Sequence, residues 1–194
     1  MGREIWKPGN MLYPVPAVMV SCARPGETPN IITVAWTGTI CSDPAMLYIS
    51  VKKSRYSHDI IKETSEFVVN LVGEEQVRAA DWCGVRSGKD FDKFKETGLT
   101  AIGSSKIHTP SIEQCPVSIE CRVSQILELG SHDMFLANVL AVTVDDRYID
   151  ENGKLHLDRA GLTTYSHGQY FGLGQYKGKF GFSVEKKKKN GKKR

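Results

Sequence analysis

The 194-residue sequence lacks the features that mark several classes of protein. No apolar stretch approaches the roughly 20 residues that a helix needs to cross a bilayer. The first residues (MGREIWKPGN) contain neither an apolar segment nor the small-residue cleavage site of a signal peptide. The five cysteines are odd in number and form no C-x-x-C pair, which argues against a disulfide framework and a structural zinc site. We therefore expect a cytoplasmic protein with reduced thiols, no membrane association and no metal.

Motifs for nucleotide binding and for hydrolysis are also missing. No G-x-G-x-x-G sequence follows a strand and no G-x-x-x-x-G-K-[ST] sequence is present, so neither a Rossmann nor a P-loop mode of phosphate binding is predicted. Ser131, His132 and Asp133 are adjacent in the chain, whereas a hydrolytic Ser-His-Asp relay is assembled from separate elements. We assign no catalytic acid, base or nucleophile.

Positive charge is concentrated at the carboxyl end. The chain carries 26 Lys and Arg against 22 Asp and Glu, and seven of the 26 lie in residues 186–194 (KKKKNGKKR). The body therefore has 19 basic residues and a net charge of −3. Blocks of like charge are usually disordered. We predict a single domain over residues 1–185 and a basic disordered tail over residues 186–194.

Strand signals dominate the body, as β-branched and aromatic runs separated by Gly, Pro, Asn and Asp. Residues 117–129 and 134–144 flank a short polar segment, which predicts an antiparallel hairpin with residues 130–133 as its turn. From 117 to 124, apolar residues at odd positions alternate with polar residues at even positions, so we expect one buried and one solvated face. The other predicted strands are residues 17–22, 31–40, 46–51 and 67–71.

Helical periodicity is weaker and is confined to residues 57–64, 74–83 and 91–96, which are too few for a βαβ fold. Many strands with short helices predict a mainly β protein, a closed or nearly closed antiparallel barrel, because closure protects strand edges. Residues 81–103 are polar and contain glycine, so we expect an excursion from the barrel of the kind that often carries function.

The most informative segment is residues 30–58 (NIITVAWTGTICSDPAMLYISVKKSRYSH). Small and hydroxylated side chains from Thr33 to Gly38 would let a flat ligand lie close to the backbone. Further on, Ser50–His58 combines three fixed cations with hydroxyls where a strand ends and a helix begins. This combination suits a phosphate, because cations, hydroxyls and free helix N–H groups all stabilise an anion.

Two other interpretations of this segment stay open. Surface cations commonly do no more than solvate the end of a strand. In a nucleic-acid-binding barrel, the Lys52–Arg55 cluster and the basic tail would form an electrostatic track for single strands. The negative charge of the body disfavours this alternative, so nucleic acid is not the expected partner.

The order and spacing of several motifs point to a known family. The motifs are NIITVAWTGTICSDPAMLYISV, SRYSHDII, EFVVNL, DWCGVRSGKDFDKF, GSHDMFLANV and YSHGQYFGLG. Across about residues 7–184, the chain resembles the flavin reductase-like proteins with the FMN-binding split-barrel fold, most closely the flavoredoxin type. The resemblance implies a non-covalent FMN, held at or near a homodimer interface. It also implies that hydride or electrons come from NAD(P)H or a reduced protein and pass to flavin, ferric ion or a partner protein.

The resemblance also implies roles for particular residues. The isoalloxazine ring would lie against a strand segment with two further residues nearby: Thr33, Val34, Ala35, Trp36 and Thr37, with Asn30 and Cys41. The phosphate would be held by Ser50, Lys52, Lys53, Ser54, Arg55 and His58. Cys83 and Gly84 would approach the cofactor from the 81–103 excursion, and Tyr165, Ser166, His167 and Tyr170 would cover it.

Some of these residues have equally ordinary structural interpretations. Trp36 could belong to the core, and Cys41 and Cys83 could be packed thiols without redox function. His132 and Asp133 resemble the family's Gly-Asp-His motif in altered order, which puts NAD(P)H use in question more than FMN binding. Their alternative is a simple role in the hairpin turn.

Overall fold

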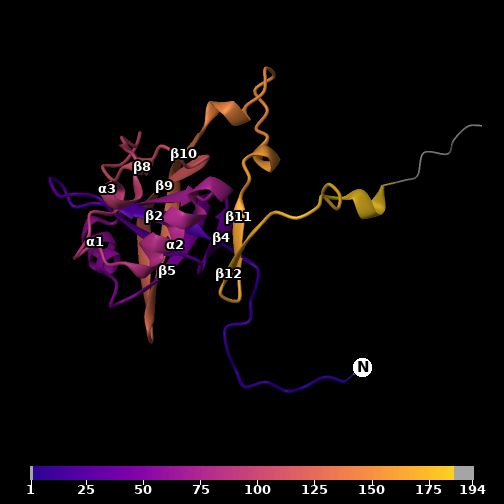
Figure 1. Ribbon diagram of the computed structural model, residues 1–194, viewed down its shortest axis with the longest axis horizontal. Coiled ribbons are helices and arrows are strands. Elements are labelled where there is room, and N and C mark those ends of the chain that lie inside the picture. The colour runs from indigo at the N-terminus through magenta and orange to yellow at the C-terminus, as the bar shows by residue number, and fades with distance from the viewer. Residues whose placement is uncertain (1, 186–194) are drawn as a thin grey trace, which may run out of the picture.

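The computed structural model describes residues 2–185, and the predicted tail at 186–194 lies outside the described residues (Figure 1). Its centre is an antiparallel sheet of seven strands in the order β3-β2-β6-β9-β10-β5-β4. The strands are β2 (Val18–Cys22), β3 (Asn30–Val34), β4 (Thr37–Ser42), β5 (Ala45–Lys52), β6 (Glu66–Leu71), β9 (Val117–Leu129) and β10 (His132–Val144). The prediction of a mainly β protein is confirmed.

The sheet curls until its two edge strands come together. β3 and β4 lie at opposite ends of the strand order, yet only Ala35 and Trp36 separate them in the chain. The predicted unbroken strand 31–40 is therefore wrong: β3 pairs with β2, whereas β4 pairs with β5. At the junction, the Ser50 N–H donates to the Trp36 carbonyl at 2.8 Å. The result is a split barrel, in which no ladder joins β3 to β4 within residues 2–185.

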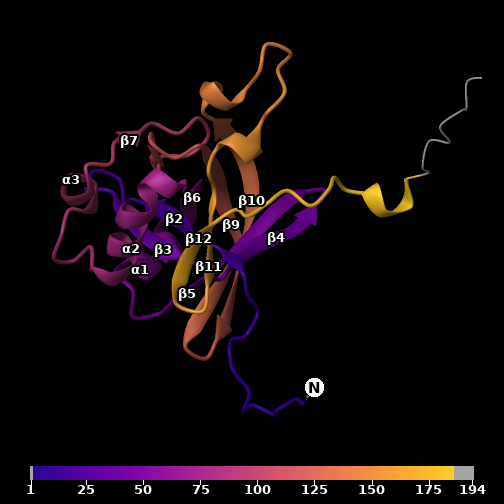
Figure 2. The same cartoon turned by 45° about the vertical axis from the view of Figure 1, so that its right-hand side comes forward.

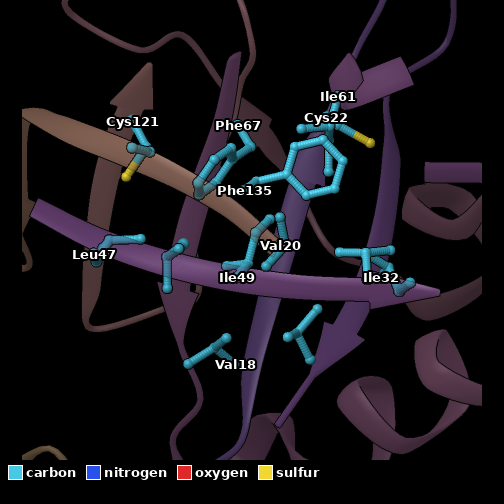
Figure 3. Packing of buried hydrophobic residues seen from close by; sticks show 14 of the residues in the cluster. Val18, Val20, Cys22, Ile32, Leu47, Ile49, Ile61, Phe67, Cys121 and Phe135 are labelled. Atoms are coloured by element: carbon cyan, nitrogen blue, oxygen red, sulfur yellow. The ribbon is translucent and has the colours of Figure 1, made fainter. Parts of the chain in front are cut away.

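The interior of the barrel holds the main hydrophobic core. Val20, Ile49, Phe67 and Phe135 come from four different strands, are fully buried and meet there (Figure 3). Burying one such side chain contributes about 1.5–3 kcal/mol, so the strands are held together mainly by this cluster. A second cluster lies beneath the helices and includes Met19, Ile31 and Cys83.

Three α-helices follow the predicted positions closely. They are α1 (Tyr56–Thr64), α2 (Val77–Val85), preceded by the 3-10 turn η1 (Glu74–Gln76), and α3 (Lys93–Thr97). The Asp92 side chain accepts from the Lys95 N–H and so starts α3 two residues later than predicted. Gly98 ends it at a positive φ of 69°, where glycine is favoured. Helices α2 and α3 both pack beside β3, so the predicted excursion stays against the barrel (Figure 2).

The β9–β10 hairpin is tighter than predicted. Leu129 pairs with His132, so the turn consists of Gly130 and Ser131 alone. His132 and Asp133 are therefore strand residues, and the interpretation of both as turn residues is wrong. Strand β10 also pairs with β5, and this pairing reaches the hairpin tip, where His132 lies opposite Lys52.

The polar face of β9 is not uniformly solvated, contrary to the prediction. Ser118 and Glu120 are buried. The Glu120 carboxylate accepts hydrogen bonds from the Ser105 and Lys106 N–H groups, both at 2.7 Å. Burial by itself raises the pKa of Glu120, but these hydrogen bonds outweigh it, and the pKa is lowered. The loop around Ser105 therefore covers the polar face of β9, which the alternation of apolar and polar residues alone would assign to solvent.

Smaller elements complete the chain. One sheet contains β1 (Val15–Pro16), β11 (Thr163–Ser166) and β12 (Gln169–Gly172), and another pairs β7 (Ala101–Ile102) with β8 (Ser111–Ile112). The 3-10 turns are η2 (Asp146–Tyr148), η3 (Leu157–Arg159) and η4 (Phe182–Val184). The N-terminal residues and the segment after β12 both extend away from the barrel (Figure 2). Among the described helices, none combines the length and apolar character needed to span a bilayer.

Candidate functional site

A cleft of about 540 Å³ opens where β3 ends, between α2, the tip of the β9–β10 hairpin and the β11–β12 hairpin. It brings together segments that are far apart in the sequence. Its lining residues are Asn10, Ala17, Ile32, Thr33, Val34, Ala35, Trp36, Ser50, Val51, Lys52, Arg55, Asp81, Gly84, Val85, Ser131, His132, Tyr165, Gly168 and Tyr170.

The β3–β4 junction forms one wall of this cleft. The Thr33 hydroxyl donates to the Ala80 carbonyl and fixes β3 against α2. Gly84 packs there so closely that a Cβ would come within 3.2 Å of the Thr33 side chain. Trp36 remains 45% exposed although it is a large aromatic residue, and its ring centroid lies 5.9 Å from that of His132. The wall therefore presents a narrow strand with one aromatic face available to a ligand.

One end of the cleft is cationic. Lys52 and Arg55 line it where β5 ends and α1 begins. A smaller recess of about 80 Å³ continues from Arg55 and Gly84. We call it the anion recess, and it is lined by Asn30, Ile32, Ser54, Arg55, Tyr56, Ser57, Cys83, Gly84, Arg86, Ser87, Gly88 and Lys93. Its hydroxyls, guanidinium groups and helix start provide donors for an anion.

Asn30 leaves a polar atom without a partner inside the anion recess. Its side-chain N–H donates to the Ser57 hydroxyl at 2.7 Å, but its buried Oδ1 has no hydrogen-bond partner among the described residues. Gly88 lies against this oxygen, and a Cβ at that position would approach it to 2.2 Å. An unsatisfied buried oxygen beside a glycine indicates a site shaped for a ligand with a hydroxyl or other donor group.

Lys93 is a buried cation that the sequence analysis missed. Its side chain is almost fully buried, and its Nζ donates to the Ile31 carbonyl at 2.6 Å and the Cys83 carbonyl at 2.7 Å. Burial lowers the pKa of Lys93 to about 8, so the Lys93 side chain is still mostly protonated, and positively charged, at neutral pH. The positive charge beneath the recess therefore comes from Lys93 as well as from the surface residues.

The cysteines near the site are not activated. Burial raises the pKa of Cys83 to about 11 and that of Cys22 to about 12. A thiol of this kind is a poor nucleophile at neutral pH. Cys83 lines the anion recess but not the main cleft. Cys41 lines neither, and its sulfur lies 3.4 Å from the Asp43 carbonyl.

The hairpin tip provides a neutral imidazole. The Ser131 hydroxyl lies 2.8 Å from His132 Nδ1. Burial and the neighbouring Lys52 charge lower the pKa of His132, so its ring is largely uncharged at neutral pH. In the tautomer in which the Ser131 hydroxyl donates to Nδ1, the other ring nitrogen, Nε2, carries the proton and can donate a hydrogen bond to a ligand.

Lys53 and His58 were predicted to bind phosphate, but in the structure both contact the carboxylate of Asp133. His58 Nε2 lies 2.8 Å from Asp133 Oδ2, and Lys53 Nζ lies 3.2 Å from Asp133 Oδ1. Burial raises the pKa of Asp133, but the hydrogen bonds from His58 and Lys53 outweigh it, and the pKa is lowered. Neither Lys53 nor His58 lines the cleft or the anion recess. Through these contacts, Asp133 on β10 connects the hairpin tip to α1 and to the turn that precedes it.

The other predicted residues divide between the cleft and its surroundings. Tyr165 and Tyr170 line the cleft, whereas Ser166 and His167 do not, and Thr37 lines a neighbouring cavity. Ser54 belongs only to the anion recess. Within residues 2–185, no group of three or more His, Cys, Asp or Glu side chains could hold a metal ion.

Several lining residues could not have been found from the sequence. Asn10 and Gly168 reach the cleft through the small β1-β11-β12 sheet, whose strands β1 and β11 are some 150 positions apart. Asp81 lies on α2 and accepts from the Tyr170 hydroxyl at 3.2 Å. Burial and the Asp81 charge raise the pKa of Tyr170 to about 12, which keeps its hydroxyl protonated. The signals near these positions were two family motifs, DWCGVRSGKDFDKF, which contains Asp81, and YSHGQYFGLG, which contains Gly168.

Comparisons with known proteins agree with this architecture. The structure superimposes on flavoredoxin of Desulfovibrio vulgaris (Miyazaki F) with a TM-score of 0.87 and 25% identity, covering 95% of this chain and all (100%) of that one. A protein of Archaeoglobus fulgidus is 33% identical over 150 residues, which are 77% of this chain and 84% of that protein. A Streptomyces viridifaciens protein named NADPH-flavin oxidoreductase is 26% identical over 150 residues, 72% of this chain and 73% of that protein.

The family model described as the flavin reductase like domain matches residues 11–174, which is most of the chain. The matched range includes the β3–β4 junction, the anion recess, the hairpin tip and the β11–β12 hairpin. The resemblance found in the sequence is thereby confirmed. The chain belongs to the flavin reductase like family and is a flavin-binding redox protein built on a split barrel.

Proposed function

We propose that residues 1–185 form a single domain that binds FMN non-covalently and acts as an FMN-dependent oxidoreductase or electron carrier. The observation that carries this proposal is the continuity of the cleft with the anion recess, which share Ile32, Arg55 and Gly84. The cleft can hold a flat ring system, and the anion recess can hold a phosphate. When bound, the flavin supplies the hydride and electron chemistry, so the protein needs no acid-base triad.

The residues present fit FMN. The unpartnered Asn30 Oδ1 can accept from a hydroxyl of the ribityl chain, and Gly88 places no side chain against this oxygen. The hydroxyls of Ser54 and Ser57 and the guanidinium of Arg55 or Arg86 suit a phosphate. Lys93 adds a charge from below, although its ammonium is committed to two carbonyls.

The size of the anion recess supports FMN over FAD. At about 80 Å³, it has room for one phosphate and little else. FAD carries a second phosphate and an adenosine, which would have to lie outside the recess. Comparing the affinities of the purified apoprotein for FMN and for FAD tests this choice, and a preference for FAD would contradict it.

The remaining cleft residues would orient the ring and control access to it. Thr33–Trp36 present backbone and small side chains along one wall, and Gly84 keeps α2 close to that wall. His132 offers a neutral N–H donor, and Trp36 offers a ring face. Tyr165 and Tyr170 lie on the β11–β12 hairpin and limit the access of water from that side.

The electron donor is NAD(P)H or a reduced protein, and the acceptor is a flavin, a ferric ion or a partner protein. The name of the Streptomyces viridifaciens relative supports a pyridine nucleotide, whereas the similarity to flavoredoxin supports a protein relay. The test is the visible spectrum of the purified protein before and after anaerobic addition of NADH or NADPH. Bleaching supports the reductase, and a spectrum that persists until a reduced protein is added supports the carrier. A colourless protein that ignores added FMN contradicts the proposal.

We also propose a homodimer in a reducing compartment such as the cytoplasm. The apolar side chains of Ile40 on β4 and of Leu140 and Val142 on β10 are exposed and would be covered by a second copy. All five cysteines are free, which suits a reducing compartment. Light scattering during gel filtration tests the assembly, and a monomeric mass for the wild type would contradict it. Val142→Glu should shift a dimer towards monomer.

A further inference from the structure

A second cavity of about 330 Å³ adjoins the flavin cleft. The two share Asn10, Ala35, Trp36 and Tyr165, so a molecule in one lies beside a molecule in the other. We call the second cavity the aromatic chamber. Its other walls are the N-terminal segment at residues 9–15 and the side chains of Thr37 and Tyr48. The N-terminal segment runs past β4 and β11 in both views (Figures 1 and 2).

The walls of the aromatic chamber are rich in rings. Tyr13, Trp36, Tyr48 and Tyr165 all contribute, and the Tyr13 and Tyr165 ring centroids are 6.1 Å apart with the planes inclined by 59°. This is the spacing of interacting aromatic pairs. Trp36, which lines both cavities, is 45% exposed and so retains ring surface that the protein does not cover. A planar ligand would cover that surface.

The lining of the chamber carries no carboxylate, ammonium, guanidinium or imidazole group. None of its lining residues is Lys, Arg, His, Asp or Glu. The flavin cleft differs, since it contains Lys52, Arg55, Asp81 and His132. A charged ligand entering the chamber would lose its hydration without gaining a counter-charge, whereas an uncharged ring would not. Orientation would come from the Asn10 amide and the tyrosine hydroxyls, since the Thr37 hydroxyl already donates to the Tyr48 carbonyl at 2.6 Å.

We propose that the aromatic chamber binds a small uncharged aromatic molecule beside the flavin cleft. A volume of about 330 Å³ lies at the lower end of the range for small-molecule pockets, which is roughly 300–1,000 Å³. Aromatic walls with a few placed polar groups are the usual lining of such pockets. The assignment goes beyond the proposed function, because the chamber recognises its ligand with residues that lie outside the anion recess.

The test is a calorimetric titration of the purified protein with 2-naphthol, repeated after addition of FMN. The probe 2-naphthoate has the same fused rings but carries a carboxylate, so it serves as the charge control. We expect 2-naphthol to bind the FMN-treated protein at least about tenfold more tightly than 2-naphthoate, because only the neutral probe avoids unpaired burial of charge. Equal affinities for the two probes would overturn the proposal.

Two variants locate the binding. Tyr48→Ala removes one ring from the chamber and Met11→Ala removes a side chain from its N-terminal wall, and neither residue lines the flavin cleft. Each should weaken 2-naphthol binding by about fivefold or more, while FMN affinity changes by less than about twofold. Met11 is 59% exposed, so its replacement leaves the barrel folded even if Tyr48→Ala does not.

A matched control separates this proposal from the proposed function. Arg55→Ala alters the anion recess and should weaken FMN binding without changing the affinity for 2-naphthol, since Arg55 does not line the chamber. If the protein binds 2-naphthol but no flavin, only the proposed function fails. If Tyr48→Ala and Met11→Ala bind 2-naphthol like the wild type, the chamber is not the site.

Discussion

Arg55 is the cation whose removal most directly tests the anion recess. It lines both the flavin cleft and the recess, just before the first residue of α1. Hydrogen bonds to charged groups contribute about 1.5–3 kcal/mol each. At about 1.4 kcal/mol per factor of ten, Arg55→Ala should weaken FMN binding by about 10- to 150-fold. Fluorescence titration of the apoprotein measures this, because bound and free FMN differ in emission.

Riboflavin separates a phosphate contact from a general disturbance of the cleft. It has the same ring and ribityl chain as FMN but no phosphate. Arg55→Ala should therefore leave the affinity for riboflavin within about twofold of the wild type, since the charge-assisted bond is absent in both proteins. Raising the salt concentration should reduce the advantage of FMN over riboflavin in the wild type more than in the variant.

Lys53→Ala is the matched control, and it distinguishes the structure from the sequence-based prediction. Lys53 lies two positions from Arg55 and has the same charge, but its ammonium faces Asp133 instead of the cleft. FMN affinity should be nearly unchanged in Lys53→Ala. Equal losses in Lys53→Ala and Arg55→Ala, or an equal loss of riboflavin affinity in Arg55→Ala, would refute the assignment of the phosphate to the recess.

Three further perturbations test other parts of the site. Ala35→Leu should obstruct the cleft, so flavin occupancy measured from the visible spectrum should fall while the melting temperature stays within a few degrees; full occupancy would contradict the wall assignment. Gly88→Ala should weaken FMN binding in a titration because the new Cβ would meet Asn30 Oδ1, and an unchanged affinity would show that the loop can yield. Asp133→Asn should cost about 1.5–3 kcal/mol in denaturant unfolding at pH 7, since it replaces the buried carboxylate that His58 and Lys53 contact. Because the folded pKa of Asp133 is lowered, this stability is present above the unfolded pKa of about 3.9 and is lost as the pH falls through the folded value, so the two unfolding curves should converge in acid.

The long strands were predictable because their signal is local. Residues 117–129 were predicted to the residue, since β-branched and polar positions alternate along them. The break at Ala35 and Trp36 was not predictable from alternation, because both halves of the segment have strand-like composition. What divides them is the choice of partner strand, which depends on residues far away in the sequence.

The cationic cluster shows why composition identifies a site better than it identifies the residues in it. Lys52 is the last residue of β5, whereas Lys53 begins the turn that leads into α1, so the two side chains do not face the same ligand. Lys52 lines the cleft, and Lys53 meets Asp133. Nothing local to the KKSRYSH segment indicates which lysine takes which side. The pairing of β5 with β10, which sets Lys52 opposite His132, decides it.

The incomplete closure of the barrel explains why the site lies at the β3–β4 junction. An edge strand has backbone N–H and C=O groups that no neighbouring strand satisfies. β3 pairs with β2 on one side, and within residues 2–185 its other side has no ladder partner. That free side continues into Ala35 and Trp36, which line the cleft. A flat heterocycle with donors and acceptors along its rim can bond to such an edge as a strand would. A fully closed barrel would have used these backbone groups for its own ladder. We therefore expect the gap that leaves the barrel split to be the feature that allows this small domain to hold a flavin.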